Sequence, residues 1–221
     1  MKGKSYACRD RKENNLRPGD FYPTPVSLVT CAKDLFYSVL PEKAIITEPC
    51  CGNGQIVKGL KQLGFSRFIE NDLYNNRNDI LHNDILTTDL DKWTSKYVVT
   101  NFPFSKWDDC VKAFLAKEEL AALITIGRLN YLSTQSRLEL GIWKHLKEVY
   151  IFSRYIDYRT PDREDGQFNV GAMATAWFYF TKEEVEAPII KFVDVQKYAT
   201  LGNILGVKNE KDLHRCLRRA L

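Results

Sequence analysis

Residues 44–54 read AIITEPCCGNG, an apolar run that leads through an acid and a proline into a turn with two glycines. The apolar residues predict a short buried strand over 44–47 that leads into Glu48. Gly52 and Gly54 predict a tight turn, because glycine adopts backbone angles that other residues resist and lets a ligand approach closely. A strand followed by such a turn is typical of α/β sheets that bind ligands at the carboxyl ends of their strands.

An amphipathic helix is expected directly after this turn. Ile56, Val57, Leu60 and Leu63 recur at the spacing of one helical face, and Gly64 stands where glycine is favoured after a helix. The free amides at the start of such a helix point toward whatever binds at the turn. The turn is therefore interpreted as a ligand-binding turn, with a plain tight turn as the alternative.

Strands and helices alternate along the rest of the chain. Further strands are expected at 65–69, 97–100, 121–126, 149–152 and 172–180, and helices at 28–39, 108–117 and 133–148. Residues 73–84 and 159–169 have the composition of polar, exposed loops. The alternation predicts an α/β fold with a mostly parallel sheet and helices on both of its faces.

The composition is that of a globular protein. The 221 residues are 44% hydrophobic and 12% aromatic, which suits one α/β domain with short extensions. No apolar run approaches the roughly 18–20 residues that a membrane span needs. The N-terminal residues are polar and lack the apolar core of a secretion signal, so we expect a cytoplasmic protein.

The cysteines do not form a metal-binding pattern. The chain has six: Cys8, Cys31, Cys50, Cys51, Cys110 and Cys216. None form a CxxC pair and only three histidines accompany them, so we expect no zinc or other metal site. All six are interpreted as reduced thiols.

Basic residues gather at the two ends of the chain, although the net charge is only +4. The first seventeen residues hold Lys2, Lys4, Arg9, Arg11, Lys12 and Arg17, and the last eight hold His214, Arg215, Arg218 and Arg219. Such ends suit contacts with nucleic-acid phosphates, and they equally suit plain solvated termini.

Acids at the ends of two expected strands suit the recognition of a nucleoside-like ligand. Asp72 lies about twenty residues beyond the glycine turn, where dinucleotide sites place the acid that accepts hydrogen bonds from ribose hydroxyls. Glu70 is the alternative for this role. Glu48 is suited to pairing with a ligand ammonium group.

Residues 101–104 read NFPF directly after the expected strand 97–100. The Asn101 side-chain oxygen can accept one hydrogen of an exocyclic amine, and a backbone carbonyl such as that of Phe102 can accept the other. This pair would orient the nitrogen lone pair, and positioning supplies much of the rate in such reactions. The Phe104 ring is suited to stacking on a base. The plain alternative is a proline turn with a buried phenylalanine.

Five motifs taken in order carry a resemblance to a known family. YPTP at 22–25, EPCCGNG at 48–54, NDL at 71–73, NFPF at 101–104 and AWF at 176–178 resemble the amino-methyltransferases that modify DNA bases. The likeness is greatest to small phage-encoded adenine-specific methyltransferases with an NPPF-type motif, and it covers about residues 20–180. It implies a Rossmann-like class I fold with seven strands, S-adenosyl-L-methionine (SAM) as cofactor and DNA as partner, in a bacterial or phage-infected cell.

The resemblance also implies roles for individual residues. The cofactor would be bound by Phe21, Tyr22, Thr24, Glu48, Pro49, Cys50, Gly52, Gly54, Asp72, Asp84 and Asn101. Among these, Asp84 resembles the acid that contacts the cofactor adenine amine. The catalytic motif that holds the target base would be Asn101, Phe102, Pro103 and Phe104. Nucleic acid would be contacted by Arg128, Tyr131, Arg159 and Arg163.

The same resemblance sets the expected domain organisation. We expect a flexible basic segment over 1–19, a methyltransferase catalytic domain over 20–186 and a helical extension over 187–221. The scarcity of further material predicts a short or weakly selective recognition site. A monomer or weak dimer is expected.

The chain departs from the family pattern at Phe102, where the family has proline. Proline fixes its own backbone and restrains the residue before it, so its loss removes a restraint from Asn101. The favoured hypothesis is methylation of the adenine amine in DNA. Cytosine, an RNA base and a protein glutamine amide stay open as substrates, as does a catalytically silent binding module.

Overall fold

The computed structural model describes residues 22–156, 158, 171 and 173–195 of the chain. Among these residues, seven strands form one sheet with the spatial order β2-β1-β3-β4-β6-β5-β7. The strands are β1 (Ile45–Glu48), β2 (Arg67–Glu70), β3 (Tyr97–Thr100), β4 (Ala122–Arg128), β5 (Leu146–Phe152), β6 (Thr175–Phe180) and β7 (Ile189–Val193). All of them run parallel except β6, which is antiparallel to β4 and β5. The mostly parallel sheet expected from the alternation of strands and helices, and the seven strands that the resemblance implies, are confirmed.

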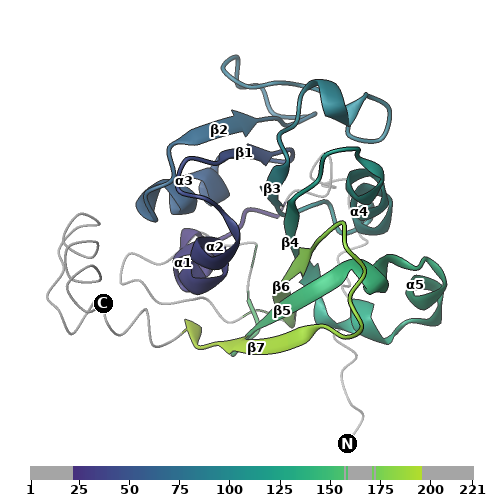
Figure 1. The fold of residues 1–221 in the computed structure, drawn as a ribbon. Coiled ribbons are helices and arrows are strands. Elements are labelled where there is room, and N and C mark those ends of the chain that lie inside the picture. The colour runs from purple at the N-terminus through teal and green to yellow at the C-terminus, as the bar shows by residue number, and fades with distance from the viewer. Residues whose placement is uncertain (1–21, 157, 159–170, 172, 196–221) are drawn as a thin grey trace, which may run out of the picture.

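Helices cover both faces of this sheet, as Figure 1 shows. On one face lie α1 (Val26–Thr30), α2 (Lys33–Val39) and α3 (Gln55–Gln62), and on the other lie α4 (Trp107–Ala116) and α5 (Gln135–Glu139). Three short 3-10 turns complete the described elements: η1 (Leu90–Lys92), η2 (Leu129–Ser133) and η3 (Ile142–His145). None of the described helices is both long enough and apolar enough to cross a membrane.

The sheet separates two hydrophobic clusters, because successive residues of a strand point to opposite faces. In β3, Val98 belongs to the cluster beneath α4, and Val99 belongs to the cluster beneath α1, α2 and α3. Trp177 and Phe178 of β6 divide in the same way. All six residues of β6 are buried, which confirms the strand expected within 172–180.

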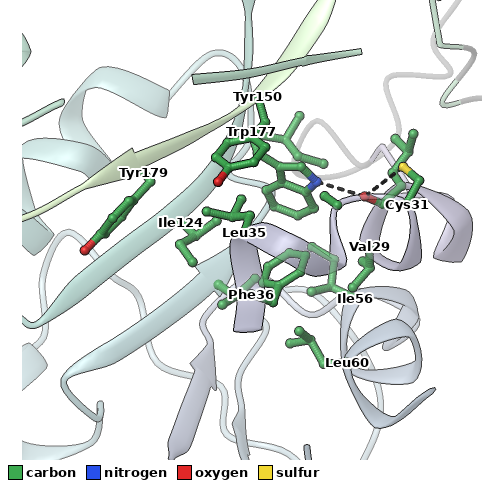
Figure 2. Close-up of a cluster of buried hydrophobic side chains, with 14 of the residues drawn as sticks. Val29, Cys31, Leu35, Phe36, Ile56, Leu60, Ile124, Tyr150, Trp177 and Tyr179 are labelled. Atoms are coloured by element: carbon green, nitrogen blue, oxygen red, sulfur yellow. Dashed lines mark hydrogen bonds between the residues drawn. The ribbon is translucent and has the colours of Figure 1, made fainter. Parts of the chain in front are cut away.

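The helical segment expected over 28–39 is divided into α1 and α2 by a tertiary hydrogen bond (Figure 2). The indole nitrogen of Trp177 donates to the carbonyl of Leu28 at 2.9 Å, and the Cys31 thiol donates to the same oxygen. In a continuous helix that carbonyl would accept the amide of Ala32, which instead donates to Val29. Contact with β6 therefore interrupts a helix that the apolar spacing predicts as continuous.

Two other expectations for the second half of the chain were wrong. Residues 133–148 do not form one helix, because Gly141 has the left-handed φ of 69° and separates α5 from η3. Strand β5 begins at Leu146, inside the expected helix. Strand β7 lies within 187–221, where we expected helices. It is an exposed edge strand, so its apolar and polar residues do not alternate as they do in a strand with one buried face.

Several expected segments lie outside the described residues. These are the basic segment 1–19, the whole of the polar loop 159–169, and the helices expected beyond residue 195.

The strand order places a ligand site between β1 and β3. The chain passes from β1 to β2 on one side and then returns to β3 on the other side of β1. In open α/β sheets, ligands bind outside the carboxyl ends of the strands where the order reverses in this way. Glu48 ends β1, and Asn101 directly follows β3, so both lie at this edge.

Helices α1 and α3 pack closely because residue 59 has no side chain. A Cβ atom at Gly59 would stand 2.6 Å from the Cβ of Val29 and 2.9 Å from each of its methyl groups. We predict that Gly59→Ala lowers the free energy of unfolding by about 1–3 kcal/mol in denaturant titrations. Overpacking of this size outweighs the gain of about 1 kcal/mol that alanine brings to a helix interior.

The control for this prediction is the double variant with Val29→Ala, which removes the overlapping methyl groups. The Gly59→Ala cost should fall in that background by about 0.5–3 kcal/mol, the coupling typical of residues in contact. Strictly additive costs would contradict the close contact.

Candidate functional site

Two adjoining cavities lie at the carboxyl ends of β1, β2 and β3. The Glu48 cavity has an empty volume of about 440 Å³ and is lined by Tyr22, Pro23, Thr24, Glu48, Cys51, Gln55, Ile56 and Asn101. The Asp84 cavity has an empty volume of about 1380 Å³ and is lined by Pro49, Leu73, Tyr74, Asn75, Asn76, Asn83, Asp84, Ile85, Leu86, Lys106 and Cys110. Both are lined by Cys50, Gly52, Asn53, Asp72 and Pro103, so they form one continuous site.

The glycine turn has the geometry that its sequence predicts. Gly52 and Gly54 have φ angles of 48° and 73°, in the left-handed region that glycine favours. The Gly54 amide donates to the Cys51 carbonyl at 2.7 Å, and α3 begins at the next residue. The amino end of α3 therefore faces the Glu48 cavity.

Glu48 is a buried carboxyl in the wall of its cavity. Its Oε2 accepts the backbone amide of Val57, in the first turn of α3, at 3.2 Å. Burial raises the pKa of Glu48 well above the ordinary 4.5, and the nearby carboxylate of Glu70 raises it further. No ion pair joins Glu48 to another described residue, so a cation in this cavity would meet an acid that lacks a counter-ion.

Asp72, two residues after β2, lines both cavities, whereas Glu70 at the end of β2 lines neither. The Asp72 Oδ2 accepts the Gly52 amide at 2.8 Å, which ties the end of β2 to the glycine turn. Its Oδ1 accepts the amides of Tyr74 and Asn75. Glu70 is instead paired with Arg77 at 2.8 Å and lines neither cavity.

Asn71 is a structural residue of the site that the sequence analysis did not single out. Its side chain is fully buried, and its nitrogen donates to the carbonyls of Pro49 and Asn83. Its oxygen accepts the Asn83 amide at 2.7 Å. The signal in the sequence was an amide residue between two acids at the end of a strand, which is indistinguishable from a solvated loop.

Asp84 lies in the wall of the larger cavity beside apolar neighbours. Its Oδ1 accepts the Leu86 amide at 2.8 Å, so the carboxylate is oriented by its own loop. Leu73, Ile85 and Leu86 line the same cavity. An apolar slot that ends in an oriented carboxylate suits a flat heterocycle with an exocyclic amine.

The side chain of Asn101 is fixed through its nitrogen. Nδ2 donates to the Tyr22 carbonyl at 3.1 Å and to Thr24 Oγ1 at 3.2 Å. The amide oxygen, Oδ1, is buried and has no hydrogen-bond partner among the described residues. The YPTP loop therefore orients an acceptor that nothing else in the described structure uses.

The residues after Asn101 are anchored in the protein interior. Phe102 is 1% exposed, and its ring stacks on that of Phe114 with 5.6 Å between centroids. The Tyr131 hydroxyl donates to the Phe104 carbonyl at 3.2 Å. Two contacts thus restrain the loop at the position where the family has its additional proline.

The Phe104 ring, predicted to stack on a base, is only 7% exposed. The Arg128 guanidinium lies over it, 4.6 Å from the ring centroid, and Tyr22 lies 5.2 Å from it. Tyr131, predicted to contact nucleic acid, is also buried. Phe21, Arg159 and Arg163 lie outside the described residues.

The thiols of Cys50, Cys51 and Cys110, which line the cavities, have raised pKa values. Among the described residues, Cys31, Cys50, Cys51 and Cys110 form no disulfide. Burial raises the pKa of Cys51 and of Cys110 to about 12, and it also raises that of Cys50. The described residues contain no cluster of three His, Cys, Asp or Glu side chains that is arranged to hold a metal ion.

Comparison with solved structures places the fold among methyltransferases. One match is a Listeria monocytogenes protein assigned to the class I SAM-dependent methyltransferases, with TM-score 0.54 and 14% identity over 85% of this chain and 71% of that chain. The type IIG restriction endonuclease BpuSI matches with TM-score 0.54 and 14% identity, over 90% of this chain and 29% of that chain. The methyltransferase subunit of a type I restriction-modification system from Streptococcus thermophilus matches with TM-score 0.51 and 13% identity, over 76% and 45%.

These likenesses show the fold. The chain has the Rossmann-like fold of class I methyltransferases, and it spans less than half the length of the two restriction proteins. No protein-family model matches the sequence, and no curated protein matches it.

The burial of Glu48 affects how the stability of the protein depends on pH. Its pKa is raised in the folded protein, so its ionisation opposes folding, and stability is lost as pH rises through the folded pKa. Glu48→Gln keeps an oxygen for the Val57 amide but cannot ionise. We predict that the ligand-free variant is more stable than the wild type at pH 8 by about 0.5–2 kcal/mol, the usual range for a stabilising substitution.

Thermal unfolding at several pH values checks this prediction. The difference between the two proteins should shrink toward pH 4.5, where the wild-type carboxyl is protonated. A stability difference between the two proteins that does not change with pH would show that ionisation of Glu48 does not destabilise the folded state.

Proposed function

We propose that this protein is a SAM-dependent methyltransferase that methylates the exocyclic amine of a DNA base, with adenine as the target. The observation that carries the proposal is the Asn101 side chain. Its nitrogen is held by Tyr22 and Thr24, and its buried oxygen is left as an acceptor at the Glu48 cavity, directly after β3. An amine hydrogen is the partner that such an acceptor suits.

The residues around the two cavities fit SAM. The cofactor supplies a methyl group on a sulfonium, which an amine nitrogen takes up while the carbon–sulfur bond breaks and a neutral thioether leaves. Glu48 would bind the ammonium of the methionine end, which supplies the cation that this buried carboxyl lacks. Asp72 would bind the ribose hydroxyls.

Further residues complete the proposed cofactor site. Asp84 would accept the adenine amine within its apolar slot. Pro49, Cys50 and the glycine turn would line the cofactor. Its methionine end would be enclosed by Phe21, Tyr22 and Thr24. The assignments of Tyr22, Thr24, Pro49, Cys50, Gly52 and Asp84 rest on the lining of the cavities and on the resemblance, and those of Phe21 and Gly54 rest on the resemblance alone.

Asn101 would act on the amine by positioning it. Its Oδ1 accepts one amine hydrogen, and the Phe102 carbonyl accepts the other, so the nitrogen lone pair points at the methyl group. The nitrogen would become positively charged on methylation and would then lose to water the proton that is hydrogen-bonded to Asn101 Oδ1, which leaves a neutral methylated amine. No strong base is needed, because orientation and the two acceptors supply the rate.

The phenylalanine at 102 is compatible with this chemistry. A backbone carbonyl is present in every residue, and the packing of the Phe102 ring on Phe114 supplies a restraint in place of the family proline. The target base would have to leave the DNA stack to reach Asn101. DNA and adenine are inferred from the resemblance, and two of the structural neighbours are restriction or restriction-modification proteins.

Transfer of labelled methyl groups tests the function. We predict that the protein transfers tritium from methyl-labelled SAM to unmethylated genomic DNA and that nucleoside analysis finds the label in adenine. At saturating SAM, Asn101→Ala should lower kcat by about 100- to 1000-fold, the usual effect of losing one preorganised hydrogen bond. Control reactions contain RNA or protein as the methyl acceptor in place of DNA.

The outcomes of this assay separate the hypotheses. Label in RNA or in protein glutamine would replace DNA as the substrate. SAM binding without transfer to any of the three would contradict an enzyme and favour a binding module.

The pH dependence of SAM binding tests the role of Glu48. Pairing with an ammonium requires the ionised carboxyl, whose pKa is raised in the free protein. We predict that affinity, measured by calorimetry, rises with pH until the carboxyl is ionised and falls above about pH 8, where amino groups lose their proton. Glu48→Gln should bind more weakly and lose the rising limb. An unchanged profile in the variant would remove Glu48 from the cofactor site.

A further inference from the structure

Arg128 covers the aromatic ring that the proposed target base requires. It is the last residue of β4, at the carboxyl edge of the sheet, and its guanidinium lies 4.6 Å from the Phe104 centroid. Phe104 is buried as a result of this and its other contacts. A base can stack on this ring only after one of the covering groups moves.

The groups around Phe104 differ in what holds them. Tyr158 contacts the ring edge-on, is fully buried and is hydrogen-bonded to β6. Tyr22 contacts it at 5.2 Å and holds Asn101 through its carbonyl. Moving either tyrosine would therefore disturb the core or the proposed acceptor.

Arg128 is held far less firmly than these tyrosines. Its Nε is buried without a hydrogen-bond partner, and its guanidinium forms no ion pair within the part of the chain that the structure describes. By contrast Arg137, which lies over the Tyr131 ring, is paired with Asp108 at 2.7 Å. Arg128 is the group that can leave Phe104 at the lowest cost.

A half-buried guanidinium without an anion is suited to binding one. Arginine presents a rigid fork of donors that fits the oxygens of a phosphate, and it also stacks on aromatic faces. Nucleic acid offers both partners at once, since the backbone supplies phosphates and the extruded base competes for the ring.

We propose that Arg128 gates the target-base pocket. It covers Phe104 in the free protein, and it moves to a backbone phosphate beside the target nucleotide when nucleic acid binds. The ring is thereby opened to the extruded base only when a phosphate is present to receive the arginine. This inference rests on the proposed function and deepens it.

The test uses two measurements in which the gate predicts opposite effects. The first is the affinity for a mixed-sequence DNA duplex over a range of salt concentrations. The second is the affinity for adenosine, which has no phosphate, with the cofactor cavity already filled by S-adenosylhomocysteine. The variants are Arg128→Ala and Arg128→Lys, with Arg67→Ala as the matched control, because Arg67 begins β2 at the opposite edge of the sheet.

For Arg128→Ala we expect weaker DNA binding, with a salt slope shallower by about 0.9, the contribution of one phosphate contact. Adenosine should bind roughly two- to tenfold more tightly, because nothing stacks on Phe104 in its place. Arg128→Lys should keep the salt slope and still gain adenosine affinity, since an ammonium reaches a phosphate but covers less of a ring. Arg67→Ala should change neither measurement.

Other outcomes overturn the gate. An unchanged salt slope in Arg128→Ala, or an adenosine affinity that falls or stays the same in both Arg128 variants, would contradict it. Unchanged SAM affinity verifies that each variant is folded, and Arg128→Lys carries the adenosine test if the alanine variant does not fold. If the wild type labels DNA and the gate test fails, only the gate is lost. If the wild type binds SAM and labels no nucleic acid, the gate and the proposed function are lost together.

Discussion

The buried Asn71, directly after β2, connects the two loops on which the rest of the site depends. It bonds to the glycine-turn loop through Pro49 and to the Asp84 loop through Asn83, and its own backbone bonds to Glu48 and Cys51. Every polar atom of this side chain has a partner inside the protein. Because a buried partner left unpaired costs about 1–3 kcal/mol, the loops keep their positions without a ligand.

Around the carboxyl ends of β3 and β4, in contrast, some buried polar atoms have no hydrogen-bond partner in the part of the chain that the structure describes. Within the described residues, the buried side-chain atoms that lack a hydrogen-bond partner are Thr100 Oγ1, Asn101 Oδ1 and Arg128 Nε, all at the carboxyl ends of these strands. Buried polar groups are normally satisfied, and proteins depart from this rule chiefly at functional sites. With the uncompensated carboxyl of Glu48, these atoms mark where the fold gives up stability in favour of a partner.

The sequence predicted best the parts of the structure that local chemistry determines. Strand β3 has the predicted bounds, and α3 lies between the two glycines that predicted its limits. The segment 133–148 was mispredicted because its apolar spacing fits a helix, and Gly141 interrupts it through one backbone angle. Asn71, the break after α1 and the stacking of Arg128 on Phe104 depend on contacts between distant residues, which no local pattern reveals.

The position of β6 between β4 and β5 affects how the chain can fold during synthesis. Strand β5 is made before β6, but it pairs only with β6 and β7, so it has no place in the growing sheet until residues 175–180 exist. The same late strand carries the indole that ends α1, 149 residues away from its partner. A nascent chain therefore holds four parallel strands with an open edge at β4, and it exposes that edge until β6 emerges. Among the described elements, the last large strand of the core to be made is thus the one that joins the two halves of the sheet.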